Sequence, residues 1–243
     1  MATIARLDEL AQADPEIAPY ARLLNIAIEA AAQDWPLQLP DAEDHLAHGE
    51  PALHGARLVL PRERLEALHE RLRNSRALDL QQLTSAVRLR DSDTIAQLTI
   101  MPVLHGVRRG CAPGVWISGI CPVCAAWPAL AESRGLDRSR FLRCGRCGSE
   151  WQLPWQLCPF CANADHASLG YLYAEETGES RRVFTCEHCH GYLKTLATLG
   201  PIDPLAVAIE DLDSLELDLA ALDASFERPT EPGFELQLEL AWS

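Results

Sequence analysis

The amino-acid sequence predicts an α+β multidomain protein, in which a helical N-terminal domain precedes two small four-cysteine modules. Apolar residues recur at helical spacing through much of residues 1–110. Four Cys-x-x-Cys pairs then follow between residues 121 and 189. The intervals inside this cysteine-rich part have the character of β-hairpins, and they divide the eight paired cysteines into two sets of four.

Length and composition place the chain among globular proteins. Its 243 residues are enough for one large or two modest domains. The N-terminus carries acidic residues and lacks the apolar segment of a secretory signal. No run approaches the ~18 apolar residues that a membrane-spanning helix needs. Nine cysteines in such a chain indicate reduced thiols and favour metal sites over disulfides. We therefore expect a cytoplasmic protein with no membrane insertion.

The net charge of −14 is unevenly distributed, because residues 199–243 carry −10 of it. A protein that binds nucleic acid needs a basic surface to displace counterions from phosphate, and no segment here is net basic. We therefore expect no nucleic-acid partner. The acidic run is typical of a solvated face, and the alternative is a docking surface for a basic partner.

In the first 110 residues, capping signals set the expected helix starts. Asp14-Pro15-Glu16 predicts a helix start with proline at the first helical position. A second clear helix begins at Pro61, and a third begins near Ser92 until Pro102 stops or kinks it. Short helices are expected at 41–48 and 78–90. The sequence predicts that these helices form a bundle with one apolar core.

A loop and domain boundary are expected where Gly106, Gly110, Pro113 and Gly114 cluster. Residues 115–117 then read as a short strand that leads into the first cysteine pair.

The four cysteine pairs have the spacing of metal-binding knuckles. Two thiolates three positions apart can point at one ion, and two such turns complete a tetrahedral shell of four sulfurs. The pairs are CPVC (Cys121, Cys124), CGRC (Cys144, Cys147), CPFC (Cys158, Cys161) and CEHC (Cys186, Cys189). Eight ligands predict two metal ions per chain.

Turn residues inside the intervals decide which knuckles share an ion. Residues 125–143 and 162–185 can each fold as a hairpin, which brings the flanking knuckles together at low loop-closure cost. The first predicted site is therefore Cys121, Cys124, Cys144 and Cys147. The second is Cys158, Cys161, Cys186 and Cys189.

Two further segments carry apolar patterns. In residues 148–157, Trp151, Leu153, Trp155 and Leu157 share one face of an expected edge strand. That face is expected to lie buried between the modules, and the alternative is a partner-binding patch. In the tail, leucines at positions 212, 215, 219 and 222 predict one helix. The alternating residues 234–242 predict a strand.

Nothing in the sequence predicts an enzyme. Two closed shells of four sulfurs leave no open coordination position for hydrolytic metal chemistry. Zinc and iron both accept tetrahedral sulfur ligands, so the ligands leave the choice between them open. His188 and His190 are expected to be surface residues and Cys111 a partly buried thiol.

The order of motifs resembles the formate dehydrogenase accessory protein family, FdhE. The residues that carry the resemblance are CPVC followed by Pro128 and Leu130, then RFLRCGRCGSEW, CPFC and CEHCHGYLKTL, and it extends over about 115–227. It implies a helical N-terminal domain followed by two rubredoxin-like or zinc-ribbon-like four-cysteine modules. It also implies iron binding through the paired cysteines. The implied role is cytoplasmic, with binding to the catalytic subunit of respiratory formate dehydrogenase during its assembly.

On this interpretation the helical domain spans 1–110, the first rubredoxin-like module 111–155, the second 156–198, and an acidic helix and strand 199–243. The chain departs from the family pattern where Ala125 and Ala162 replace the usual knuckle glycine, the residue best suited to a positive φ. Two other function classes stay open. A zinc-ribbon nucleic-acid or transcription-complex module would use Arg143, Arg146, Arg181 and Arg182. A thiol-disulfide oxidoreductase would use one of the Cys-x-x-Cys pairs.

Overall fold

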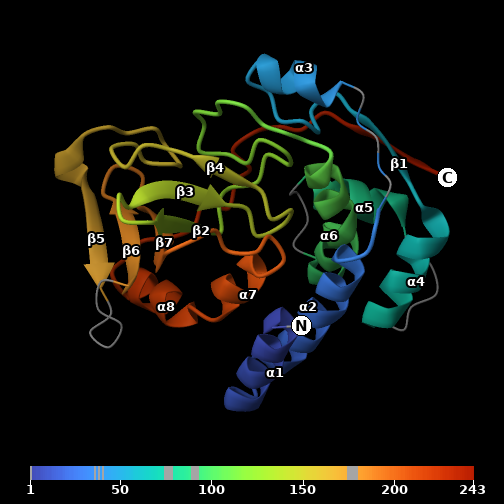
Figure 1. The fold of residues 1–243 in the computed structure, drawn as a ribbon, viewed down its shortest axis with the longest axis horizontal. Coiled ribbons are helices and arrows are strands. Elements are labelled where there is room, and N and C mark those ends of the chain that lie inside the picture. The colour runs from blue at the N-terminus through green and yellow to red at the C-terminus, as the bar shows by residue number, and fades with distance from the viewer. Residues whose placement is uncertain are drawn as a thin grey trace. The chain divides into compact units, whose positions relative to one another are not determined.

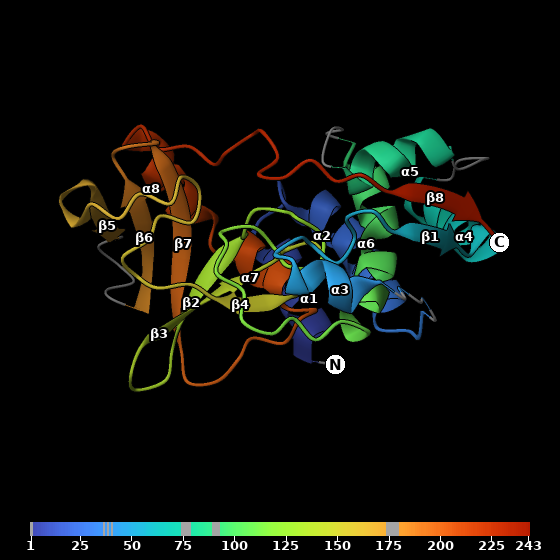
Figure 2. The ribbon, with the colours of Figure 1, turned by 90° about the horizontal axis from the view of Figure 1, so that it is seen from above.

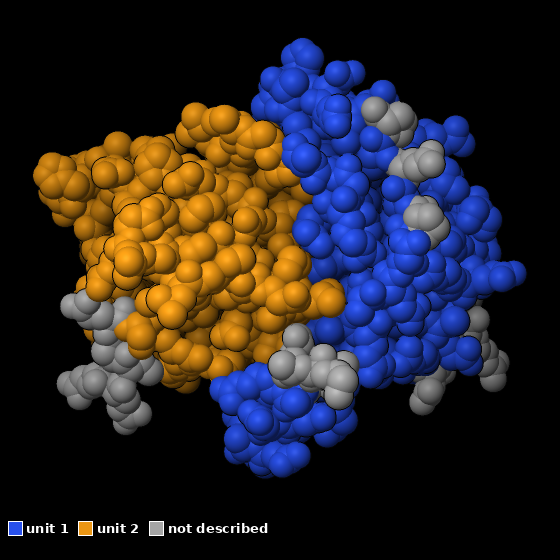
Figure 3. Space-filling model, in the orientation of Figure 1, with its two compact units in different colours: residues 1–112, 235–243 blue, residues 113–234 orange. Residues whose placement is uncertain are grey.

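The computed structural model describes residues 2–35, 37, 39, 41–73, 79–88, 93–173 and 180–243. The chain folds into two compact units, which Figure 3 colours separately. Unit 1 comprises Met1–Ala112 together with Glu235–Ser243, and unit 2 is Pro113–Phe234. The two units are compact parts of the structure. They do not test the four predicted domains, which stay a prediction about which segments fold separately.

Unit 1 is a helical bundle built around α6 (Figure 1). Its helices are α1 (Ala2–Ala13), α2 (Ala18–Ala31), α3 (Ala42–Ala47), α4 (Arg62–Arg73), α5 (Leu80–Val87) and α6 (Thr94–Arg109). Nearly every residue of α6 from Ala96 to Val107 is buried, and α2, α4 and α5 all pack against it. A helix that is apolar on all sides is typical of the centre of a bundle.

Two helix boundaries differ from the prediction. The Asp14 side chain accepts a hydrogen bond from the Glu16 backbone at 2.8 Å and forms a local turn, so α2 begins only at Ala18. The expected start at Ser92 lies outside the described residues, and Asp93 caps α6. Pro102 lies inside α6, which continues to Arg109, so the helix does not stop there. Burial on all sides offsets the hydrogen bond that the proline removes.

Unit 1 also contains a two-stranded parallel sheet of β1 (Arg57–Leu60) and β8 (Glu239–Trp242), paired from Arg57↔Glu239 to Leu60↔Trp242. The strand predicted over 234–242 is therefore shorter, because its partner offers only four residues. The preceding Leu236 and Leu238 are nevertheless buried.

Unit 2 contains one six-stranded sheet in the order β4-β3-β2-β7-β6-β5 (Figures 1 and 2). The strands are β2 (Leu130–Arg134), β3 (Ser139–Arg143), β4 (Glu150–Gln152), β5 (Leu169–Tyr173), β6 (Arg181–Cys186) and β7 (Gly191–Thr198). Antiparallel β2–β3 and β5–β6 are the two expected hairpins, and β4 is an edge strand as predicted. A parallel pair of β2 with β7, from Leu130↔Lys194 to Arg134↔Thr198, joins the two halves.

Two helices, α7 (Val207–Leu212) and α8 (Leu215–Asp223), follow the sheet, and α8 packs on β6 and β7 (Figure 1). The single predicted helix with a leucine face is wrong. Leu215, Leu219 and Leu222 are exposed, whereas Leu217 and Ala221 join the buried core. The break between α7 and α8 shifts the helical phase, so a stripe read continuously across it lies on the wrong side.

Candidate metal centres

The sulfur atoms of the eight paired cysteines form two groups, and within each group all four lie within 4.8 Å of one another. Cluster 1 is Cys121, Cys124, Cys144 and Cys147. Cluster 2 is Cys158, Cys161, Cys186 and Cys189. The predicted fold class is confirmed: a helical N-terminal region precedes two four-cysteine, zinc-ribbon-like modules.

The sulfur separations fit a tetrahedral metal shell. Metal–sulfur bonds of about 2.3 Å place neighbouring sulfurs ~3.8 Å apart. In cluster 1 the sulfurs of Cys124 and Cys147 are 3.8 Å apart, and those of Cys121 and Cys147 are 3.5 Å apart. In cluster 2 the Cys158–Cys189 and Cys161–Cys186 separations are 3.7 and 3.8 Å. Each group can hold one ion, although this geometry leaves the choice between iron and zinc open.

The four knuckles share one backbone geometry. In the first three, the amide four residues after the first cysteine donates to that cysteine's carbonyl at 3.0 Å, as Ala125 does to Cys121. In the fourth, Cys186 pairs with Gly191 where β6 turns into β7. The residue after the second cysteine always has a positive φ. The angles are 60° at Ala125, 72° at Gly148, 57° at Ala162 and 54° at His190. Non-glycine residues thus occupy three of these strained positions.

Cluster 1 is enclosed. All four of its cysteines are 0% exposed. The Ser149 hydroxyl lies 3.0 Å from the sulfur of Cys147, and the Val123 amide lies 3.4 Å from that of Cys121. Burial raises the pKa of Cys121 and of Cys147 well above its usual value. Thiolates in this enclosure would be stabilised by a cation coordinated between the four sulfurs.

Cluster 2 has one buried and one open side. Cys158 and Cys186 are buried, Cys161 is partly exposed, and Cys189 is exposed. His188 and His190 are exposed, as expected, and neither is grouped with the sulfurs.

Glu132 connects the strands beside cluster 1 and was not anticipated from the sequence. Its buried carboxylate accepts hydrogen bonds from Arg143, from Arg134 and, at 2.9 Å, from the Thr198 hydroxyl. Burial opposes ionisation, but the Arg134 hydrogen bond and the Arg143 charge outweigh it, so the pKa of Glu132 lies below its usual value. No sequence motif marks Glu132, because its partners lie on three different strands that come together only in the folded sheet.

Arg140 plays a different part on the cluster 2 side. Its guanidinium donates to the backbone carbonyls of Leu153, Pro154 and Leu157, the last of which directly precedes Cys158. No carboxylate pairs with Arg140 in the described part of the chain. Burial lowers its pKa to about 10, so the group is still charged at neutral pH. Its carbon Cζ also lies 5.2 Å from the centre of the Trp155 ring.

Lys194 connects the segment after the last knuckle to the acidic helical segment that follows the sheet. It lies in the HGYLK segment after the last knuckle, is fully buried, and forms ion pairs of 2.7 Å with Asp211 and Asp218. In the same motif, a Cβ on Gly191 would lie 2.7 Å from the Phe160 ring, so that position requires glycine. The motif therefore docks the α7–α8 segment onto the sheet.

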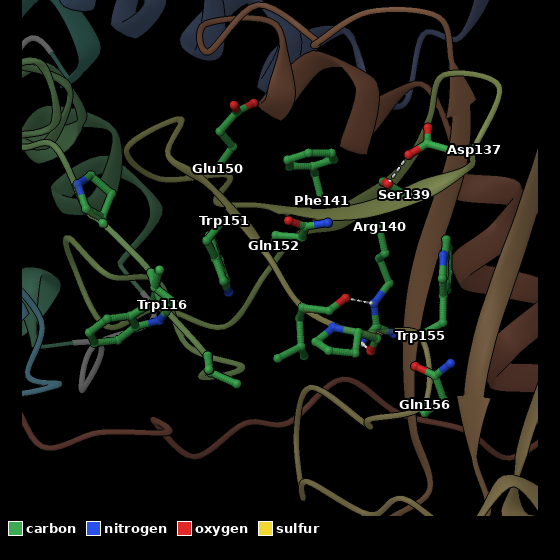
Figure 4. A pocket seen from close by; sticks show the side chains of 16 residues that line it. Trp116, Asp137, Ser139, Arg140, Phe141, Glu150, Trp151, Gln152, Trp155 and Gln156 are labelled. Carbon is green, nitrogen blue, oxygen red and sulfur yellow. Dashed lines mark hydrogen bonds between the residues drawn. The ribbon is translucent and has the colours of Figure 1, made fainter.

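A hollow of about 740 Å³ lies along the edge strand β4 (Figure 4). Residues 113–117 line one part and 150–156 another, with Arg140 and Phe141 also in the lining. The predicted strand at 115–117 is absent, and the exposed fractions there are 91% for Val115 and 71% for Ile117. On the predicted apolar face, Trp151 and Leu153 are buried and Trp155 is half-buried, so most of that face belongs to the core.

Known proteins resemble this chain in sequence. No family model matches it. A protein named Protein FdhE homolog from Pectobacterium carotovorum is 28% identical over 264 residues, covering 92% of this chain and 82% of the relative. The homologue of the same name from Aquifex aeolicus is 32% identical over 115 residues. That match covers 46% of this chain and only 40% of the Aquifex protein.

The fold also has a solved counterpart. The crystal structure of the FdhE protein from Pseudomonas aeruginosa matches with a TM-score of 0.67, covering 94% of this chain and 92% of that one at 23% identity. In the described residues no helix combines the length and apolar character that crossing a bilayer requires. The chain is thus similar in sequence to proteins named Protein FdhE homolog, and the structural match shows that it shares its fold with the Pseudomonas aeruginosa protein.

Proposed function

We propose that this chain is a metal-binding accessory protein for the catalytic subunit of a respiratory formate dehydrogenase, which it binds in the cytoplasm during assembly. The observation that carries the proposal is the similarity to FdhE homologues, which in one relative extends over 92% of this chain. The two clusters support the metal-binding part of the proposal, because each has the sulfur geometry of a four-cysteine site.

Each cluster holds one ion, iron or zinc, through its four cysteines. Four sulfurs complete the shell and leave no position for a substrate or an activated water. This supports a structural or metal-handling role and a protein that is not itself an enzyme. The helical domain and the surface between the modules bind the client, while the modules hold that surface in shape.

The arginines favour a protein client over nucleic acid. Arg143 is buried against Glu132, and Arg181 forms an ion pair of 2.9 Å with Asp213. Arg182 stacks over Tyr171, with its Cζ 4.2 Å from the ring centre. These arginines, which a zinc-ribbon nucleic-acid module would use, thus have intramolecular partners, which leaves little basic charge to contact phosphate.

The proposal is tested by affinity capture of the tagged full chain from anaerobically grown host cells, followed by mass spectrometry. We expect a formate dehydrogenase catalytic subunit to be enriched. A Cys158→Ser/Cys161→Ser variant should lose it if the second module is needed for binding. Capture of nucleic-acid machinery, or of no dehydrogenase under inducing conditions, would contradict the proposed client.

A surface variant separates client binding from metal binding. Val115 and Ile117 are apolar, strongly exposed and line the hollow beside β4, so they offer contact area to a partner at little cost to the fold. Val115→Asp/Ile117→Asp should reduce capture of the dehydrogenase several-fold and leave the metal content unchanged. Full capture by this variant would exclude the hollow as the client surface.

A further inference from the structure

We propose that the two clusters have different roles. Cluster 2 exchanges its metal ion at the side where Cys161 and Cys189 lie, and cluster 1 retains its ion. The inference rests on the metal binding in the proposed function and assigns its two sites unequal roles. The ligand class is a divalent cation with an affinity for sulfur, delivered or removed by a thiol or chelating donor.

Corresponding positions of the two clusters differ in exposure. The second cysteine of each knuckle is fully buried in cluster 1, at Cys124 and Cys147, whereas in cluster 2 Cys161 is partly exposed and Cys189 exposed. The residue after the second cysteine follows the same rule. Ala125 and Gly148 are buried in cluster 1, and Ala162 and His190 are exposed in cluster 2. Because the backbone geometry of the knuckles is shared, the difference comes from what packs around them.

The buried half of cluster 2 is held in place. Cys158 follows Leu157, whose carbonyl accepts a hydrogen bond of 2.7 Å from Arg140. Cys186 ends β6 and pairs with Gly191 of β7. Two of the cysteines thus lie on fixed sheet and turn, while the other two are the partly exposed and the exposed residue of the cluster. This arrangement allows a partial shell to persist during exchange.

The exchange step follows from this asymmetry. A donor that approaches the exposed side forms one bond to the ion as the bond from Cys189 breaks, and the released thiolate takes a proton from water. Attack needs access, as in other thiolate chemistry. Cluster 1 offers no comparable path, because all four of its sulfur-bearing residues are 0% exposed.

The test uses the full chain loaded with two Zn²⁺ ions and mixed with excess 4-(2-pyridylazo)resorcinol, whose absorbance reports zinc release. A Cys111→Ser background removes the thiol outside both clusters. We expect two phases of one ion each, with the fast phase at least about tenfold faster because access limits attack. Cys189→Ser removes one ligand of cluster 2 and should accelerate the fast phase only, and Cys147→Ser, at the corresponding position of cluster 1, should accelerate the slow phase only.

A second readout needs no cysteine variant in the clusters. After a brief exposure to the chelator, N-ethylmaleimide is added and the labelled cysteines are identified by mass spectrometry. Labelling of the four cluster 2 cysteines before those of cluster 1 supports the proposal. Equal rates, or earlier labelling of cluster 1, would overturn it while leaving two-site metal binding intact. A chain that binds no zinc or iron would instead refute the metal binding itself.

Discussion

The two four-cysteine clusters have nearly the same sulfur geometry and the same knuckle backbone, but they lie in different surroundings. Cluster 1 is enclosed, and the arginine beside it, Arg143, is neutralised by Glu132. Cluster 2 is open on one side, and its nearby arginine, Arg140, is bound by backbone carbonyls instead of a carboxylate. The comparison teaches that the ligand motif defines what can bind, while the packing around it defines how firmly it is held and how accessible it is.

The largest expected effect comes from removing one cluster at a time. Cys121→Ser/Cys124→Ser and Cys158→Ser/Cys161→Ser should each lose about one ion per chain. Metal binding is also folding free energy, on the order of 10 kcal/mol for a structural four-ligand zinc site. Because all four cysteines of cluster 1 are buried, its loss should lower the unfolding temperature of unit 2 more than loss of cluster 2 does, while the remaining cluster keeps its ion. Metal analysis measures the loss of ions, and thermal unfolding measures the loss of stability. An equal loss of stability in the two variants would contradict the expected difference between the clusters.

The next effect concerns the charge beside cluster 1. Glu132→Gln removes the buried carboxylate that pairs with Arg143 and leaves it the more exposed Glu150, 3.5 Å away, so we expect a cost of about 3 kcal/mol of unfolding free energy. The folded-state pKa of Glu132 lies below the usual value of 4.5, so the carboxylate stabilises the fold above that pH. The stability difference between wild type and variant should therefore shrink as the pH falls below 4.5. Urea titrations between pH 3 and 7 measure it, and a difference that does not change with pH would rule out the ionised carboxylate as its source.

A smaller effect is expected at Arg140, beside cluster 2. Arg140→Gln removes a cation that bridges three carbonyls, and we expect a loss of about 2–3 kcal/mol, because hydrogen bonds from charged donors are stronger than neutral ones. The variant should also speed zinc release from cluster 2 and leave cluster 1 unchanged. Arg182→Gln is the matched control, since Arg182 stacks on the same Trp155 ring from a half-buried position. Equal effects of the two substitutions would mean that stacking, and not the carbonyl bridge, supports the knuckle.

The smallest expected effect is on stability, when the alanine after the second cysteine of a knuckle is replaced by glycine in either cluster. Ala125 and Ala162 both adopt a left-handed conformation after the second cysteine, where glycine is free of strain. Ala162→Gly removes the strain at an exposed position and should stabilise the loaded protein by up to about 1 kcal/mol. Ala125→Gly also removes a fully buried methyl, worth about 0.8 kcal/mol, so its net effect should be near zero. Calorimetry of both variants measures the difference. A larger gain at Ala125 would contradict the enclosed environment of cluster 1.

The sequence was most informative where structure is local. The two hairpins were predictable because turn residues and flanking apolar runs lie within a few positions of each other, and they brought together the sulfur sets that the structure groups. Helix α4 was predictable for the same reason, with Leu65, Leu68 and Leu72 buried on one face. The leucine stripe of the tail misled, because a two-residue break between α7 and α8 changes the phase that periodicity assumes.

By itself, the sequence determined which cysteines can share an ion, that the first part of the chain is helical, and which family the chain resembles. Tertiary structure alone decided the parallel joining of β2 to β7, the return of the last residues to pair with β1, the ion pairs of Glu132 and Lys194, and the open side of cluster 2. The physical reason is separation along the chain. Knuckles and hairpins close short loops, whereas burial and ion pairing depend on segments that meet only after the whole unit has folded.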